Sequence, residues 1–291
     1  MQEQPFFDAH THVQFAAYDA DREAVILRAR AAGVRFVNVG TQKDTSRRAV
    51  DLAERYDGVY AAIGLHPVHT SKSFHDADEL DADQDNKGFT SRGEIFDVNY
   101  YRELALHQKT VAIGECGLDY FHFNENEDRD TQIQKQKDAF LAQIALAGEV
   151  KKPLMIHCRE AFPDLISILH SSSSILHPQN PGIIHFFSGS ADDMRSLLDL
   201  GFSFTFGGAI TFPPRKKEME NQYHGLVLAI PADRILSETD APYVAPALYR
   251  GKRNEPAYVI EVVKKLAELK NISMDEMKLQ IRQNAARIFG L

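Results

Sequence analysis

Two histidines near the start of the chain have a spacing that suits metal binding. His10 and His12 follow the apolar pair Phe6 and Phe7, and residues two positions apart in an extended chain project to the same side. Neutral imidazole is the commonest metal ligand among side chains. The pair therefore predicts half of a metal site at the end of a buried strand, and the alternative is a chance pair of surface histidines.

Other groups capable of metal or acid–base chemistry occur at the same kind of position, directly after short apolar runs. They are His66, Glu115, His157, His185 and Asp240. Five of the 12 histidines thus follow predicted strands, whereas solvated histidines would mostly lie on helix faces and loops. Because the carboxyl ends of barrel strands form one ring around the mouth, we expect these residues to converge if the chain folds as a barrel.

The apolar runs alternate with segments of helical pattern, as expected for parallel strands connected by helices. The predicted strands are Phe6–Ala9, Val34–Val39, Val59–Gly64, Thr110–Gly114, Pro153–Ile156, Gly182–Ile184, Phe202–Phe206 and Arg234–Leu236. The predicted helices are Arg22–Ala32, Thr45–Tyr56, Ile95–His107, Thr131–Gly148, Phe162–His170, Ala191–Leu200, Pro256–Leu269 and Met274–Gly290. These units predict one α/β domain over residues 1–291, a (β/α)8 TIM barrel. A doubly wound open sheet is the alternative, but no glycine-rich phosphate fingerprint follows a strand.

A polar and acidic insertion, residues 71–92, interrupts this alternation. Three aspartates within Asp81–Asp85 fit the first ligand positions of a calcium loop. However, Asn86 stands where such a loop needs glycine, and Arg92 stands where the bidentate glutamate belongs. We therefore expect a solvated loop insertion rather than a calcium site.

Composition places the chain among ordinary globular proteins, with 44% hydrophobic and 25% charged residues. No run of about 18 apolar residues is present, so no membrane contact is expected. No signal peptide is visible, and two cysteines do not make a disulfide framework, so we expect a cytoplasmic protein. Cys116 and Cys158 each neighbour a site residue, so strand alternation predicts that both pack in the core. No obligate protein partner is indicated.

The formal net charge of -8 argues against a general nucleic-acid binder, which usually carries a basic face. It leaves open an enzyme that has a local basic mouth or that holds cations.

The predicted ligands are sufficient for two divalent cations, which lie about 3.5–4 Å apart in two-metal sites. Glu115 is the natural bridge, since it follows a strand midway around the barrel. His10 and His12 would hold one ion with Asp240, and the remaining two histidines would hold the other. Asp240 is also placed to accept a proton from water, which makes it the candidate base. The metal ligands predicted in this way are His10, His12, Glu115, His157, His185 and Asp240.

Eight short motifs follow one another along the chain in a specific order. They are Asp8–His12, Gly64–Pro67, Gly114–Tyr120, His157–Arg159, His185–Gly189, Glu238–Tyr243, Lys252–Pro256 and Asn284–Phe289. In these motifs the chain resembles, nearly from end to end, the TatD-like metal-dependent deoxyribonucleases. The resemblance implies a TIM-barrel hydrolase that holds two divalent cations and cuts the phosphodiester bonds of DNA as a 3′-to-5′ exonuclease.

The resemblance places the family's ligands on the six residues named above, with Asp240 and Glu115 as the catalytic pair, and its third-strand histidine on His66. Histidine-rich ligands suit zinc or manganese, whereas nucleases often use magnesium. The alternative activity is a D-aminoacyl-tRNA deacylase or another amidohydrolase-like hydrolase of esters or amides, because the same site suits carbonyl chemistry. A binding protein that has lost catalysis is disfavoured by the complete ligand set.

The chain departs from the family pattern at three places. Glu160 stands where aspartate is usual, and Phe121–Phe123 stands where an arginine is expected. The insertion at 71–92 is also longer than usual. These departures concern the substrate contacts rather than the metal ligands.

Substrate contacts are predicted from positively charged or polar residues near the strand ends. His66 is a candidate phosphate or water contact, with a structural strand-end residue as the alternative. Arg159 lies two residues after His157 and turns to the same side, so it is a candidate phosphate contact, with a plain surface charge as the alternative.

Two basic clusters follow the last two predicted strands. One is Arg215–Lys217, and the other contains Arg250, Lys252 and Arg253. Three basic residues usually mark a solvated run, but two clusters on one rim of an acidic protein predict a channel for the DNA backbone. The aromatic residues expected to stack on unpaired bases in that channel are Phe212, Tyr243 and Tyr249.

Overall fold

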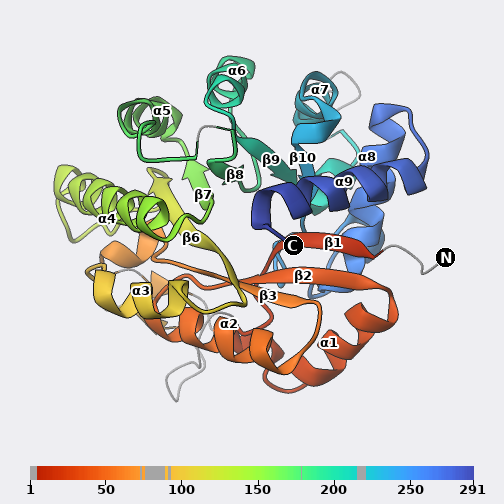
Figure 1. The fold of residues 1–291 in the computed structure, drawn as a ribbon, viewed down its shortest axis with the longest axis horizontal. Helices are drawn as coiled ribbons and strands as arrows, with labels where there is room; N and C mark the ends of the chain where they lie inside the picture. The colour runs from red at the N-terminus through yellow and green to blue at the C-terminus, as the bar shows by residue number, and fades with distance from the viewer. Residues whose placement is uncertain (1–4, 73, 76–88, 91–92, 178, 215–220) are drawn as a thin grey trace.

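Eight parallel strands follow one another in a single sheet that curves into a nearly closed barrel (Figure 1). The computed structural model describes residues 5–72, 74–75, 89–90, 93–177, 179–214 and 221–291. The strands of the barrel, in their order around the sheet, are β1 (Phe6–Thr11), β2 (Val34–Val39), β3 (Val59–Ile63), β6 (Thr110–Asp119), β7 (Leu154–Arg159), β8 (Gly182–Ile184), β9 (Ser203–Phe206) and β10 (Ile235–Ser237).

Hydrogen bonds at the ends of β1 and β10 draw the two edges of the sheet together. The buried Asp8 carboxylate accepts hydrogen bonds from Thr239 N at 2.8 Å and from Thr239 Oγ1 at 2.6 Å. Beyond it, Asp240 N donates to His10 O at 2.9 Å, and His12 N donates to Ala241 O at 2.8 Å. The predicted TIM barrel is therefore confirmed, and its closure places the first and last site residues side by side.

Helices surround the strands, as Figure 1 shows. The α-helices are α1 (Arg22–Ala31), α2 (Lys43–Arg55), α3 (Val98–Ala105), α4 (Arg129–Val150), α5 (Phe162–Ser171), α6 (Ala191–Asp199), α7 (Gln222–Ala229), α8 (Val259–Lys270) and α9 (Met274–Phe289). The short 3-10 helices are η1 (Ala16–Tyr18), η2 (Pro67–Thr70), η3 (Gly208–Thr211), η4 (Ala232–Arg234), η5 (Ala247–Tyr249) and η6 (Pro256–Tyr258). Among the described residues, none of the helices has the length and apolar character to span a membrane.

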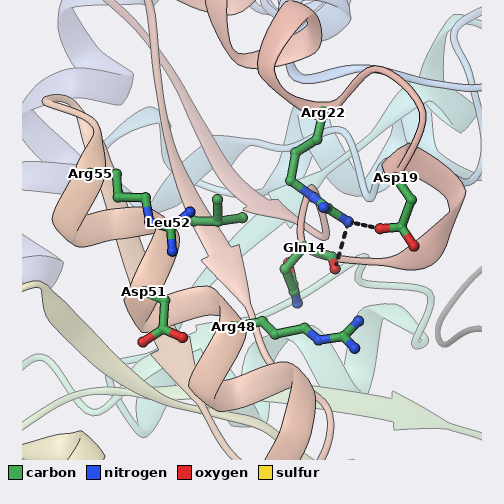
Figure 2. A pocket seen from close by; sticks show the side chains of 7 residues that line it. All are labelled: Gln14, Asp19, Arg22, Arg48, Asp51, Leu52 and Arg55. Carbon is green, nitrogen blue, oxygen red and sulfur yellow. Dashed lines mark hydrogen bonds and ion pairs between the residues drawn. The ribbon is translucent and has the colours of Figure 1, made fainter.

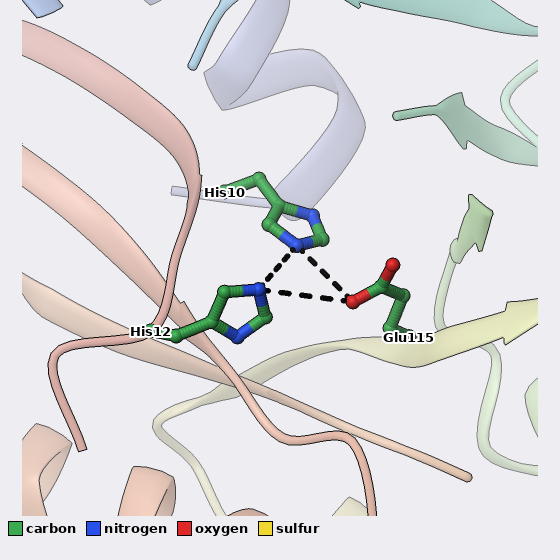
Figure 3. A group of neighbouring side chains, drawn as sticks. All are labelled: His10, His12 and Glu115. Carbon is green, nitrogen blue, oxygen red and sulfur yellow. Dashed lines mark hydrogen bonds and ion pairs between the residues drawn. The ribbon is translucent and has the colours of Figure 1, made fainter. Parts of the chain in front are cut away.

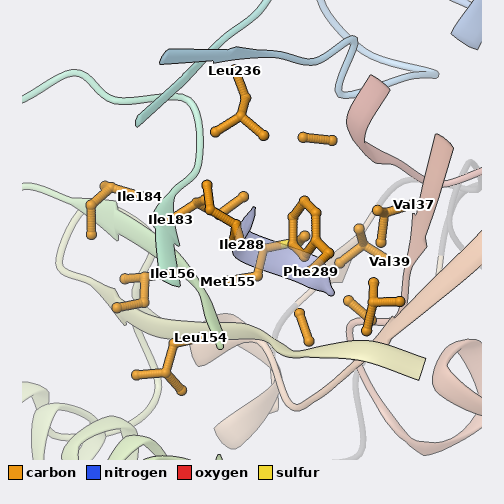
Figure 4. Packing of buried hydrophobic residues seen from close by; sticks show 14 of the residues in the cluster. Val37, Val39, Leu154, Met155, Ile156, Ile183, Ile184, Leu236, Ile288 and Phe289 are labelled. Atoms are coloured by element: carbon orange, nitrogen blue, oxygen red, sulfur yellow. The ribbon is translucent and has the colours of Figure 1, made fainter. Parts of the chain in front are cut away.

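The end of α9 packs against the amino-terminal part of the barrel. Figure 4 shows Ile288 and Phe289 among apolar side chains of the strands. The Phe289 ring stacks on that of Phe7, with 5.9 Å between the ring centroids. Burial of such side chains stabilises the fold by about 1.5–3 kcal/mol each. The end of α9 is thus part of the buried core. Cys116 and Cys158 belong to the same core, as expected.

β6 and β7 extend furthest beyond their predicted ends, and β1 also continues past Ala9 to Thr11. β6 continues past Gly114 and β7 continues past Ile156, because the two strands pair up to Asp119 opposite Arg159. The helix α7 has no counterpart among the predicted helices, since its apolar residues do not keep a helical spacing. Of the insertion 71–92, the structure describes β4 (Phe74–His75) and β5 (Phe89–Thr90), which pair antiparallel, whereas its acidic centre lies outside the described residues.

Candidate active site

A cleft of about 1150 Å³ opens at the carboxyl ends of the strands. This volume exceeds the range of about 300–1,000 Å³ that is usual for small-molecule pockets. Its lining includes most of the residues predicted from the sequence, namely His12, His66, Glu115, His157, Arg159, His185 and Asp240. His10 is fully buried beneath them and reaches the same cluster through its ring.

Glu115 lies at the centre of the cluster and divides its two carboxylate oxygens between two groups of imidazoles. Its Oε2 lies 3.3 Å from His10 Nε2 and 3.8 Å from His12 Nε2, as Figure 3 shows. Its Oε1 lies 3.1 Å from His157 Nδ1 and 3.2 Å from His185 Nε2. This arrangement is the one expected of a carboxylate that bridges two neighbouring cation sites.

The local backbone of β6 aims Glu115 into the barrel. The pairing with β7 shifts its register between Ile113 and Cys116, and such bulges redirect side chains near active sites. Gly114 has a φ of 153°, and a Cβ at this position would approach Met155 O to 2.3 Å. Only glycine fits there. The Gly114–Glu115 pair in the sequence therefore has a structural reason, which is close contact with the neighbouring strand.

Three of the histidines are oriented by acceptors behind them, which leaves the other ring nitrogen facing Glu115 or Asp240. His12 Nδ1 lies 2.7 Å from Val39 O. His157 Nε2 lies 3.0 Å from Asp119 Oδ2, and His185 Nδ1 lies 3.2 Å from Glu238 Oε2. An acceptor on one ring nitrogen fixes the proton there and leaves the other nitrogen free for a metal.

His66 has the opposite arrangement. Its Nδ1 accepts a hydrogen bond from Val68 N at 3.3 Å, so the neutral ring carries its proton on Nε2. That nitrogen lies 3.3 Å from Glu115 Oε1. Burial lowers the pKa of His66 to about 4, so the ring is neutral at pH 7. His66 is therefore better suited to donate a hydrogen bond than to ligate a cation.

The two carboxyls that face the imidazoles remain ionised. Burial would raise the pKa of Glu115, but the surrounding imidazoles, His66 foremost, outweigh it and hold that pKa well below its usual range. Burial likewise opposes ionisation of Asp240, but a hydrogen bond from His12 lowers its pKa. Asp240 has a φ of 55°, the left-handed region that aspartate tolerates better than most residues. Non-glycine residues in this region tend to occur at functional sites.

Several positioning residues were missed by the sequence reasoning. Two buried glutamines of α4 fix the ends of neighbouring strands from outside the barrel. Gln143 accepts a hydrogen bond from Leu65 N at 2.8 Å and donates to Leu65 O at 3.0 Å. Gln136 binds the backbone of Asp119 in the same way, with both distances 2.8 Å. Their spacing places them on the buried face of α4, which the sequence predicted from its apolar residues alone.

The predicted substrate contacts divide into two groups. His66 and Arg159 line the cleft, whereas Arg250, Lys252 and Arg253 are not among its lining residues. Arg253 donates to Asp21 Oδ2 at 2.7 Å and to Ala17 O at 2.6 Å, which attaches it to η1 and the start of α1.

The aromatic predictions divide similarly. Tyr243 lines the cleft. The ring of Phe212 lies under the Arg250 guanidinium at 4.8 Å, and that of Tyr249 stacks on Tyr258 at 3.7 Å. Arg215–Lys217 lies outside the described residues.

The donor set fits divalent cations. Three groups of possible ligands have their ligand atoms within 4.8 Å of one another: His10, His12 and Glu115; His10, His185 and Glu238; and His66, Glu115 and His157. Nearly all of these side chains are buried, and His10 Nε2 and His12 Nε2 approach to 3.1 Å. Imidazole and carboxylate together suit zinc or manganese.

A TIM barrel with this donor set at its mouth defines the class of metal-dependent hydrolases. The model of the TatD related DNase family matches residues 7–290, and the chain belongs to this family. It is 40% identical over 286 residues to the uncharacterized metal-dependent hydrolase YabD of Bacillus subtilis, which covers 98% of this chain and 99% of that protein.

Two further comparisons give the same result. The chain is 34% identical over 292 residues to a 3'-5' ssDNA/RNA exonuclease TatD of Pantoea ananatis, which covers 98% of this chain and 99% of that protein. The crystal structure of the TatD homologue YjjV of Escherichia coli superposes with a TM-score of 0.78 at 28% identity, covering 98% of each chain. The protein is therefore a metal-dependent hydrolase of this family.

Proposed function

We propose that the protein hydrolyses phosphodiester bonds of single-stranded DNA from the 3′ end, with two divalent cations on either side of Glu115. The observation that carries the proposal is the division of the Glu115 oxygens between two groups of imidazoles. A phosphodiester carries charge on non-bridging oxygens, and two cations about 3.5–4 Å apart are suited to neutralise it during an in-line displacement.

The residues that would hold each cation follow from the contacts. His10 and His12 face Oε2 of Glu115 together with Asp240, whose Oδ1 lies 3.4 Å from His12 Nε2. His157 and His185 face the other oxygen. Divalent cations supply Lewis acidity at this position, which acidifies water and stabilises charge that develops on phosphate.

The chain's own side chains provide the proton and hydrogen-bond chemistry. Asp240 is ionised and faces the cluster, so it accepts the proton of the attacking water. His66 presents its Nε2 proton to the same space and donates a hydrogen bond to a phosphate oxygen. The acceptors behind His157 and His185 keep both rings aligned while the substrate is bound.

The size of the cleft and the named relatives support a nucleic-acid substrate. The cleft, of about 1150 Å³, has room for more than one nucleotide unit, and the family description and the Pantoea relative both name nuclease activity. Binding by Arg250, Lys252 and Arg253 stays a prediction.

The test is an assay of the metal-depleted protein reconstituted separately with zinc, manganese or magnesium. The substrates are 5′-labelled single-stranded DNA, the matched RNA and a D-aminoacyl-tRNA. We expect a ladder of products from DNA that shortens one nucleotide at a time, and no ladder with Glu115→Ala. Deacylation of the tRNA without cleavage of either nucleic acid would contradict the proposal and favour the alternative hydrolase.

A further inference from the structure

One wall of the cleft presents an aromatic ring with a guanidinium positioned over it. The guanidinium carbon of Arg159 lies 3.9 Å from the centroid of the Phe121 ring. Phe121 follows β6, Arg159 is the last residue of the neighbouring strand β7, and both line the cleft together with the predicted metal ligands. Arg159 is only two residues from His157. The pair is therefore held on the wall next to one half of the metal cluster.

Phe121 is unusual in its exposure. The residue is 52% exposed, although the Arg159 guanidinium lies over its ring. Among the large apolar side chains that are exposed in the described part of the chain, it is the one aromatic residue and the one that lines the cleft. An isolated exposed leucine on a surface requires no explanation, but an open aromatic face inside a catalytic cleft marks a contact for a flat ligand.

The backbone that carries Phe121 is fixed at both ends. Asp119 Oδ1 accepts hydrogen bonds from Phe121 N at 2.9 Å and from His122 N at 2.8 Å. Further along, Gln132 accepts from Asn124 N and donates to Asn124 O, both at 2.9 Å. The same Asp119 carboxylate contacts the metal-site residue His157 at 3.0 Å. The ring is thus held in a constant position relative to the metal cluster, which reduces the entropy cost of stacking a ligand on it.

We propose that Phe121 and Arg159 form a stacking subsite for one unpaired base of the substrate strand. The base extends the stack formed by the ring and the guanidinium, and both surfaces are common partners of unstacked bases. The N–H groups of a stacked guanidinium point outward in its plane, so Arg159 remains able to bind the adjacent phosphate. A paired base in a duplex has no free face, so the subsite selects single strands. This inference rests on the proposed nuclease function.

The test removes either the base or the ring. A set of 5′-labelled single-stranded DNA oligonucleotides carries one abasic residue, placed at successive positions from the 3′ end. At one position, we expect loss of the base to lower kcat/KM of the wild-type enzyme by about 5- to 150-fold, which corresponds to about 1–3 kcal/mol per stacked base. For the intact strand, kcat/KM of Phe121→Ala should be lower than that of the wild type by the same factor. Removal of the base should then cause no further fall in kcat/KM of this variant.

Three further variants and a measurement of melting temperature serve as controls. They distinguish stacking from a loss of charge, from a loss of apolar surface and from a loss of stability. Phe121→Tyr keeps the ring and should therefore retain the dependence on the base that Phe121→Ala loses. Arg159→Lys keeps the charge without the flat face, so it should lose part of the base dependence. Leu106→Ala removes an apolar side chain that is 68% exposed and lies outside the cleft lining, and should change nothing. Melting temperatures should be equal within a few degrees, because Phe121 is exposed.

Equal effects of base removal on the wild type and on Phe121→Ala at every position would overturn the subsite while leaving the nuclease intact. Failure of the wild type to cleave any intact oligonucleotide would instead overturn the proposed function, and the subsite with it.

Discussion

Two pockets near the end of β1 contain many charged groups but differ in how those groups are satisfied. In the metal cleft, buried imidazoles and carboxylates converge on one another at 3.1–3.8 Å. The second pocket, of about 310 Å³, is lined by Gln14, Asp19, Arg22, Arg48, Asp51, Leu52 and Arg55 (Figure 2). Val39 O connects the two pockets, because it accepts hydrogen bonds from both His12 Nδ1 and Gln14 Nε2.

In the second pocket, the Arg22 guanidinium is paired with neighbouring backbone carbonyls and with a carboxylate. Arg22 donates to Val13 O at 2.9 Å and to Phe15 O at 2.9 Å, and it also forms an ion pair with Asp19. In the cleft, His10 Nε2 and His12 Nε2 lie 3.1 Å apart, and the buried His10 Nδ1 has no hydrogen-bond partner in the described part of the chain. Because these buried nitrogens converge on the oxygens of Glu115 and Asp240, a cation is the group that could contact all of them at once. The comparison shows that a candidate metal site is indicated by ligand groups that converge on one another and not by the number of charges.

Among substitutions in the two pockets, Glu115→Ala should cause the largest loss of activity and of bound metal. Loss of this carboxylate removes a predicted ligand from both halves of the cluster. Loss of a residue that only orients a metal ligand costs up to roughly 100-fold, so activity of Glu115→Ala should fall by more than that. Metal analysis should find fewer than two cations per chain. Asp51→Ala is the matched loss of a carboxylate in the second pocket and should leave both quantities unchanged. Wild-type turnover of Glu115→Ala with two bound cations would show that Glu115 is not the bridge.

Asp240→Asn should have the next largest effect. Asparagine keeps the size of the side chain but not its basicity, so kcat should fall by about 10²–10⁴-fold, the usual contribution of general acid–base catalysis. Calorimetry should find a melting temperature close to that of the wild type, and KM for DNA should change little. An unaltered kcat and pH–rate profile would show that Asp240 is not the base.

Asp119→Asn should weaken metal binding without abolishing it. The carboxylate orients His157 and also binds the backbone of the Phe121 segment. Loss of such an outer partner typically costs about 10–100-fold in metal affinity or activity. The affinity is measured by calorimetric titration of the metal-depleted protein. Glu238→Gln offers an independent comparison on His185, and equal affinities in wild type and both variants would refute a positioning role.

The smallest effect is expected for Arg48→Ala. Arg48 lines the second pocket and is partly exposed, and surface substitutions of this kind usually change the free energy of unfolding by less than about 0.5 kcal/mol. Its kcat and its metal content should equal those of the wild type. A loss of activity in this variant, at unchanged stability, would show that the second pocket takes part in catalysis after all.

The barrel and the convergence of the candidate ligands were predictable because both depend on local patterns. Short apolar runs indicate buried parallel strands, and a histidine after such a run lies at the mouth of a barrel. The pair His10 and His12 illustrates the rule, as a spacing of two residues directs both side chains inward. The meeting of these candidate ligands in one cleft then follows from the topology of the barrel.

The groups behind the ligands were missed because they depend on contacts between distant segments. Val39 O is a backbone atom that no residue pattern identifies. Glu238 did carry a usable signal, since it precedes Asp240 by the same spacing of two residues that relates His10 to His12. Gln136 and Gln143 were overlooked because the buried face of α4 was read from its apolar residues, whereas these buried amides bind strand-end backbone groups.

The bridging position of Glu115 is tested most directly by anomalous diffraction from crystals soaked in manganese or zinc. We expect two peaks about 3.5–4 Å apart, with one oxygen of Glu115 directed at each. One peak should lie beside His10 and His12, and the other beside His157 and His185. A single peak at saturating metal, or two peaks of which neither contacts Glu115, would contradict the bridging position.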